Sequence, residues 1–319
     1  MKKVLLSTVV FLVLFSCQHD VEYNTTTTNS IAKRSCASQD VLDAQLLADP
    51  TLAIRMNQIE AFTQKRQLSN SRLVGGKIVI PVVVNVLYRT AAENISDARI
   101  ASQIDVLNKD FTATNPDLIN LNATLFSGLQ ANVDITFVLV KINRKATTKT
   151  SWGTRDTMKN AKQGGISPTA PASNLNFWVC TIGGGILGYA QFPGGSSQTD
   201  GVVCDSKYVG ITTNTAGAYP YNLGRTATHE VGHWMNLRHI WGDTTCGSDL
   251  VADTPNHNAA NYGVPTYPHL STCTGTPIEM TMNFMDYTDD RGMYMFTNGQ
   301  KSRMTALFAS GGVRAGFRN

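Results

Sequence analysis

Four apolar segments after residue 77 have the composition of buried strands. They span 78–87, 133–142, 176–182 and 201–209. Between the first two, Ser96 can cap a helix, and apolar residues follow it at helical spacing. These are Ile100, Ile104, Leu107 and Phe111. A strand, a helix and then several strands predict an α/β fold with a mixed sheet.

The preceding segment, 34–72, shows a weaker helical pattern that Asp49-Pro50 interrupts. Its end carries basic residues among polar ones, in a stretch that we expect to be open to a protease. These basic residues are Lys65, Arg66 and Arg72. The pattern therefore predicts a partly helical segment that proteolysis can separate from the strands.

The first residues indicate export. A cationic start precedes an apolar run that is too short to span a bilayer but suits a signal-peptide core. The run ends in Leu-Phe-Ser before Cys17, which resembles a bacterial lipobox. We expect a signal peptide at 1–16 and a lipidated flexible tether at 17–33; the alternative is an ordinary secretory peptide cleaved nearby. The protein would then be a bacterial outer-membrane or cell-surface lipoprotein, or be secreted after processing.

Composition excludes several classes of protein. Only 16% of the 319 residues are charged, which argues against a disordered chain or a coiled coil. The net charge is +4, and no cluster of basic residues with interleaved aromatics points to nucleic acid. We therefore expect a globular protein with one large or two smaller domains.

Half of the six histidines fall within one eleven-residue window, inside a predicted helix over 225–237 and just beyond it. His229 and His233 are four residues apart and share one helix face, where two imidazoles can hold one Zn²⁺. His239 can reach the same ion if the chain turns sharply after the helix. Asn236 suits that turn, because asparagine tolerates the left-handed conformation that ends helices.

Glu230 follows His229 and projects roughly 100° further round the helix. A carboxylate there can take a proton from a water that the metal activates. Three protein ligands leave one position for water, as in catalytic sites, whereas structural zinc sites prefer four ligands that include cysteine. The alternative, that these are ordinary core histidines, gives no reason for their clustering.

The segment HEVGHWMNLRH resembles the metzincin zinc motif, with Asn236 in place of the usual glycine. Together with NFMDY at 283–287 and DTP at 253–255, it resembles the pappalysin family over about residues 75–319. The resemblance implies a metzincin-type α/β catalytic domain of two subdomains. A mixed twisted sheet with active-site and backing helices would lie in 73–240, and an irregular C-terminal subdomain in 241–319. The segment 34–72 would be a propeptide.

The resemblance also implies roles for individual residues. His229, His233 and His239 would bind zinc, and Glu230 would act as general base and then general acid. Met285 would form the hydrophobic floor under the metal, although ordinary core packing is an alternative for it. Tyr287 would hydrogen-bond the tetrahedral intermediate, the alternative being a structural hydroxyl.

Six cysteines, less Cys17 if it is lipidated, leave an odd number. The resemblance implies a disulfide between Cys246 and Cys273. A second family disulfide is missing as a unit, because its positions correspond to Val264 and Gly292. Pairing of Cys180 with Cys204, which lie on predicted strands, remains open.

Cys36 lies in the predicted propeptide, and its thiolate can occupy the water position on zinc and keep the enzyme latent. The family resemblance supports this interpretation, and a free or mispaired thiol is the alternative.

Two further sites are implied. An oxygen-rich loop is a candidate for Ca²⁺, with a solvated acidic loop as the alternative; it contains Asp243, Asp249, Asp253 and Thr254. Asp289 and Asp290 fall where the family builds a substrate pocket. An acidic group there would select Arg or Lys next to the cut, unless Arg291 neutralises it.

These observations predict an exported zinc endopeptidase that is made as a zymogen. Its substrates would be proteins or peptides, and its cofactors would be zinc and, if the oxygen-rich loop binds it, calcium. It would be a monomer that contacts the membrane only through a lipid anchor. The alternatives are a non-catalytic surface adhesin on the same scaffold and a zinc hydrolase of other bonds.

Overall fold

The computed structural model describes residues 33–68, 77–212 and 217–317. The predicted signal peptide, the lipidation at Cys17 and the processing residue Arg72 lie outside the described residues. No helix in the described part of the chain is long and apolar enough to cross a bilayer.

A five-stranded sheet forms the framework, with strand order β2-β1-β3-β5-β4. Its strands are β1 (Ile78–Tyr88), β2 (Ile135–Ala146), β3 (Leu175–Cys180), β4 (Gly188–Ala190) and β5 (Val202–Asp205). All neighbours pair in parallel except β4, which runs antiparallel to β5. The mixed sheet confirms the predicted fold class. β4 was not predicted, because three residues are too few to show a period.

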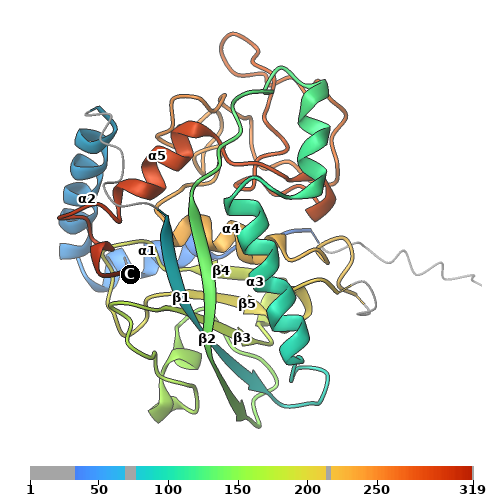
Figure 1. The fold of residues 1–319 in the computed structure, drawn as a ribbon. Helices are drawn as coiled ribbons and strands as arrows, with labels where there is room; N and C mark the ends of the chain where they lie inside the picture. Colours follow the sequence, from blue (N-terminus) through green and yellow to red (C-terminus); the bar gives the residue numbers. More distant parts are fainter. Residues whose placement is uncertain (1–32, 69–76, 213–216, 318–319) are drawn as a thin grey trace, which may run out of the picture. The chain divides into compact units, whose positions relative to one another are not determined.

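Helix α3 (Asp97–Phe111) begins as predicted, where the Ser96 hydroxyl accepts the backbone N–H of Arg99. Its apolar face packs against the sheet (Figure 1), and the predicted face residues belong to the main core together with alternate residues of β1. The α3 residues therefore cover the side of the sheet to which these alternate β1 side chains point.

Cys180 and Cys204 are both buried and remain free thiols. The strand register explains why they do not pair. Cys204 lies beside Val179 rather than beside Cys180. Since successive side chains of a strand point to opposite faces, the two thiols lie on opposite sides of the sheet and in different core clusters.

Helix α4 (Arg225–Trp234) crosses behind the sheet in Figure 1 and packs against β4 and β5. It is shorter than the predicted 225–237, because the chain already leaves helical geometry at Asn236, with φ of 68°. The left-handed conformation predicted for Asn236 is therefore present.

From residue 240 to helix α5 (Asn298–Ala306) the chain contains little regular structure. The disulfide Cys246–Cys273, implied by the family resemblance, is present there. Val264 and Gly292 lie side by side, because a Cβ on Gly292 would come within 3.3 Å of a Val264 methyl. This neighbourhood agrees with a second bridge having been lost as a unit.

Two N-terminal helices, α1 (Ser38–Ala48) and α2 (Thr51–Leu68), are separated at Asp49-Pro50 as predicted. α1 packs beside β4 and α2 beside α5, where Glu60 receives two hydrogen bonds from Arg303. Lys65 and Arg66 lie in the last helical turn of α2.

Candidate active site

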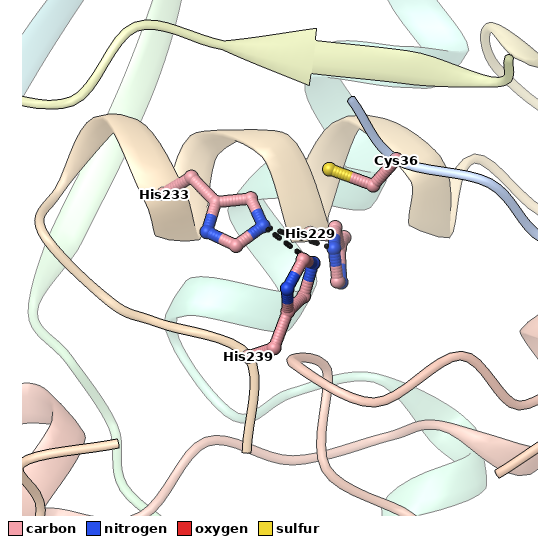
Figure 2. Close-up of side chains that lie close together, drawn as sticks. All are labelled: Cys36, His229, His233 and His239. Atoms are coloured by element: carbon pink, nitrogen blue, oxygen red, sulfur yellow. Dashed lines mark hydrogen bonds between the residues drawn. The ribbon is translucent and has the colours of Figure 1, made fainter. Parts of the chain in front are cut away.

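The three predicted metal ligands converge on one point (Figure 2). The Nε2 atom of His233 lies 3.1 Å from the Nε2 atoms of both His229 and His239. Ligands of a tetrahedral zinc, each at ~2.0–2.1 Å, would be about 3.3 Å apart. The turn at Asn236 is what brings His239 back to the two helical histidines.

Each imidazole is oriented by a bond at its other nitrogen, Nδ1. The partners are the carbonyls of Phe284 and Leu237 for His229 and His233, and the carboxylate of Asp243 for His239. Because each Nδ1 faces an acceptor, it carries the proton, and the Nε2 lone pairs point at one another. Burial and the neighbouring imidazole of His239 lower the pKa of His233 to about 3. Three converging Nε2 atoms, each on a ring fixed at Nδ1, fit a divalent cation.

Met285 lies directly beneath this group. A Cβ on Gly232, in the helix between the two histidines, would approach the Met285 sulfur to 2.4 Å. Glycine at 232 therefore permits the close contact between helix and turn. Met285 is fully buried, and its carbonyl accepts the N–H of Ile240, next to His239. The predicted floor position is present.

Glu230 faces the N-terminal segment. Its Oε2 atom accepts the Ser38 hydroxyl at 2.9 Å and lies 3.3 Å from the Cys36 sulfur. Burial raises the pKa of this carboxyl to about 8. Such a carboxyl can hold or release a proton near neutral pH.

The Tyr287 hydroxyl reaches the same place from the irregular region. It accepts the Cys36 N–H at 3.3 Å and donates to the Cys36 carbonyl at 3.2 Å. Its ring packs edge-on against His239, whose other face stacks on Trp241. A hydroxyl that donates to a peptide carbonyl beside the histidines can do the same to a substrate.

The segment 33–38 runs along β4 and covers the histidines and Glu230, and we call the place that it fills the cleft. Ser35 and Ala37 exchange backbone hydrogen bonds with Leu187 and Gly188, and the bridge to β4 runs parallel. This places the Cys36 sulfur with the three imidazoles; the four ligand atoms lie within 4.8 Å of one another. Within the described residues, they form the one cluster of this kind.

Arg34 enters a second, fully buried place in the same cleft. Its guanidinium pairs with Asp290 at 2.5 Å, bonds the Thr288 carbonyl and lies over the Tyr221 ring. The other oxygen of Asp290 accepts the backbone N–H groups of Leu223 and Arg225. We call Asp290 with these neighbours the Asp290 pocket.

Asp289, predicted to share this pocket, does not pair with Arg34. Partial burial raises its pKa, and the nearby charge of Arg291 opposes that shift. Arg291 therefore acts on Asp289, while Asp290 remains available to an arginine.

The four predicted calcium ligands are not brought together. Asp243 orients His239, and Asp249 accepts the Thr254 hydroxyl through both oxygens. Asp253 accepts the Thr297 hydroxyl and the Gly299 N–H, at the start of α5. Each of these side chains already has a hydrogen-bond partner in the protein, and the described residues give the calcium prediction no support.

Sequence reasoning did not single out Arg34, Ser38 or Trp241. The one available signal was the position of Arg34 two residues before Cys36. If Cys36 lies at the metal centre, Arg34 must lie close to it in the chain. Nothing local marked Ser38, because its partners lie on distant strands and helices.

Comparison with known proteins gives a consistent result. The profile of the family described as pregnancy-associated plasma protein-A matches residues 180–309. An extracellular metalloprotease of Pyricularia oryzae is 31% identical, over 86% of this chain and 83% of the relative. One from Arthroderma otae is 34% identical, over 81% and 86%.

Two solved structures from Tannerella forsythia are similar in fold and sequence. A promirolysin mutant matches with a TM-score of 0.81 at 39% identity, covering 89% of this chain and 97% of that one. Mature mirolysin with a cleaved peptide matches with a TM-score of 0.73 at 42% identity, covering 76% and 96%.

Proposed function

The chain belongs to the pappalysin family and is a zinc metalloendopeptidase of the metzincin type, and on this premise we propose that it is made as a latent precursor and cleaves beside basic residues. The observation that carries the proposal is the occupation of one cleft by residues 33–38. Cys36 lies at the histidines, and Arg34 lies in the Asp290 pocket.

His229, His233 and His239 would hold the zinc, because their Nε2 lone pairs converge and their Nδ1 atoms are fixed. When bound, zinc would lower the pKa of a water toward ~7 and polarise the substrate carbonyl.

Glu230 would accept the proton of the attacking water and later deliver it to the leaving amine. Burial raises the pKa of its carboxyl in the latent chain, and the hydrogen bonds from Cys36 and Ser38 oppose that shift. Tyr287 would donate a hydrogen bond to the carbonyl oxygen as negative charge develops, as it donates to the Cys36 carbonyl here. Met285 would support the histidines from below.

Latency would result from two groups of the N-terminal segment. The Cys36 thiolate would take the ligand position that water needs, and the Ser38 hydroxyl would occupy the Glu230 carboxylate. The coverage of the two Tannerella forsythia structures supports a removable segment, since 89% of this chain matches promirolysin and 76% the mature form.

A preference for Arg or Lys is supported by the Asp290 pocket. A buried guanidinium is paired there with a carboxylate, a carbonyl and an aromatic face. A substrate arginine would meet the same groups after Arg34 has left.

Export is supported by the curated fungal relatives, which are named extracellular. Anchoring through a lipid on Cys17 rests on the sequence pattern alone.

The proposed activity is tested with purified protein and a library of peptides, some with Arg or Lys and some without. Mass spectrometry should show cleavage next to basic residues, complete loss with a chelator and recovery with Zn²⁺. The N-terminus of the active form should lie beyond residue 68. A non-catalytic protein on this scaffold would leave all peptides intact, with or without zinc.

A further inference from the structure

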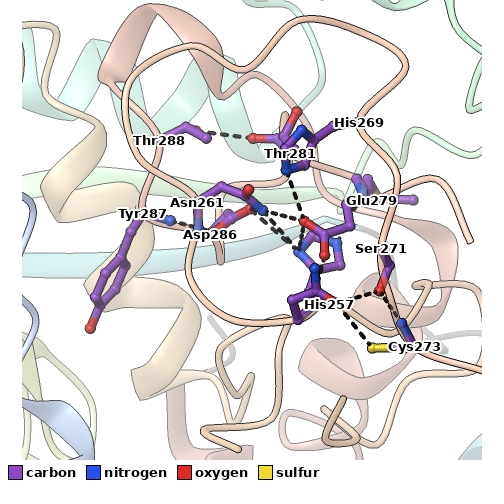
Figure 3. Close-up of polar contacts among 12 residues, drawn as sticks. His257, Asn261, His269, Ser271, Cys273, Glu279, Thr281, Asp286, Tyr287 and Thr288 are labelled. Carbon is purple, nitrogen blue, oxygen red and sulfur yellow. Dashed lines mark hydrogen bonds and ion pairs between the residues drawn. The ribbon is translucent and has the colours of Figure 1, made fainter. Parts of the chain in front are cut away.

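A second cluster of buried polar residues lies behind the catalytic turn, within the irregular region. Its members are His257, Asn261, Glu279 and Asp286 (Figure 3). All four are at most 9% exposed. In Figure 3 the Tyr287 ring points away from this cluster, and its hydroxyl bonds the Cys36 carbonyl.

Asp286 joins the cluster to the active site, because it stands between Met285 and Tyr287 in the chain. Its Oδ1 atom accepts the backbone N–H of Tyr287 and that of Asn261, each at 2.8 Å. Its Oδ2 atom accepts the Asn261 side-chain amide at 3.0 Å. The carboxylate therefore fixes the backbone from which the Tyr287 ring projects.

His257 determines where that carboxylate lies. Its Nε2 atom accepts the Met280 N–H at 2.9 Å, so the ring proton is on Nδ1. Nδ1 faces Asp286 Oδ2 at 3.4 Å and Glu279 Oε2 at 3.9 Å. The imidazole thus stands between two buried carboxylates, and Asn261 donates to both of them.

The disulfide cysteines contact the backbone of His257 and the side chain of its neighbour Asn258. The N–H of Cys246 donates to the carbonyl of His257, and the Cys273 sulfur lies 3.6 Å from the Asn258 side chain. Burying two carboxylates is costly, and apolar packing of the same volume would give equal or greater stability. Hydrogen bonds have fixed directions, so this polar cluster instead holds the turn that carries Tyr287 in one defined position.

We propose that His257 and Asp286 are positioning residues that set the placement of the Tyr287 hydroxyl for the reaction. The proposal rests on the function proposed above for Tyr287. It extends the active site to a cluster that touches neither the metal ligands nor Glu230 through any bond described here.

A double-mutant cycle tests this proposal. The variants are His257→Gln, Tyr287→Phe and the double variant, each matured and checked for its N-terminus and zinc content. We expect His257→Gln to lower kcat about tenfold with little change in KM. In the Tyr287→Phe background the same substitution should have no further effect on kcat, since there is no hydroxyl left to position.

His269→Gln is the matched control. His269 lies 3.7 Å from the same Glu279 oxygen, but it is 42% exposed and does not face Asp286. Its substitution should leave kcat and KM unchanged. If His257→Gln fails to fold, Asp286→Asn enters the cycle, because asparagine keeps the shape and one oxygen that can accept the two backbone N–H groups.

The outcomes separate the two proposals. Equal kcat losses from His257→Gln in both backgrounds overturn the positioning role and leave Tyr287 as a catalytic residue. An unchanged kcat in Tyr287→Phe overturns the role of Tyr287 itself, and the positioning role with it. A loss confined to KM, or an equal loss in His269→Gln, also overturns the positioning role.

Discussion

The segment 33–38 contacts two places in one cleft, and they are built from different physical parts. At the histidine centre (His229, His233, His239 and Glu230), burial lowers the pKa of His233 to about 3 and raises the pKa of the Glu230 carboxyl to about 8. In the Asp290 pocket, burial is compensated by an ion pair and by backbone N–H donors. One place suits proton transfer, and the other suits the binding of a fixed charge.

This difference implies that chemistry and substrate choice can be separated by substitution. The histidine centre acts on the peptide bond, which every substrate has. In the proposed function, the Asp290 pocket would bind a side chain that only some substrates have. A change at the centre should therefore affect all substrates equally, whereas a change in the pocket should affect basic substrates alone.

The largest effect is expected for Glu230→Gln. Glutamine keeps the volume of the side chain but cannot accept the proton of the attacking water, so kcat should fall about 10²–10⁴-fold. The loss should be the same for substrates with and without Arg, with zinc content and melting temperature unchanged. Parallel kinetics, metal analysis and thermal unfolding measure this; retained activity would contradict the role of Glu230.

A smaller and selective effect is expected for Asp290→Asn. The substitution leaves a substrate guanidinium buried without its anion, which costs about 2–5 kcal/mol. The ratio of kcat/KM for Arg over Leu peptides should therefore fall at least about thirtyfold. Asp289→Asn is the matched control, because Asp289 does not pair with Arg34. An equal fall for both peptides would mean that Asp290 supports the fold rather than selection.

The histidine centre could be predicted from sequence because its geometry is local. His229, His233 and Glu230 lie on one helix. His239 follows a turn, which Asn236 predicts because asparagine tolerates the left-handed conformation. The sheet was predictable for a similar reason, since long buried strands such as β1 have a nearly continuous apolar composition. Short β4 has no such signal.

The Asp290 pocket could be predicted only in part. An acidic residue there was expected from the family resemblance, but its partner Arg34 lies 256 residues away in the chain. The same limit explains the calcium prediction, because local density of oxygen atoms does not show that Asp243 and Asp253 bond elsewhere. Pairing of Cys180 with Cys204 depended on strand register, which apolar composition does not fix to one residue.

The smallest change in activity is expected for a substitution of Ser38. Its side chain contacts the histidine centre but not the Asp290 pocket, so it separates the two places. Ser38→Ala removes the hydroxyl that donates to Glu230 and also accepts the Ala190 N–H. Because burial raises the pKa of Glu230 to about 8, its carboxyl is largely neutral at pH 7. A neutral hydrogen bond contributes about 0.5–1.5 kcal/mol, so the uncleaved chain should gain activity of roughly two- to tenfold. Cys36→Ala should increase it further, because it frees a ligand position.

The measurement is the initial rate of peptide cleavage by chain that gel analysis shows to be uncleaved. Ser35→Ala is the control, because Ser35 meets Leu187 through its backbone carbonyl, which alanine keeps. If the segment acts on the two places independently, Ser38→Ala should raise the rate for Arg and Leu peptides alike, while Arg34 still excludes a basic side chain from the pocket. A gain restricted to Arg peptides would show that the two places are coupled through the segment.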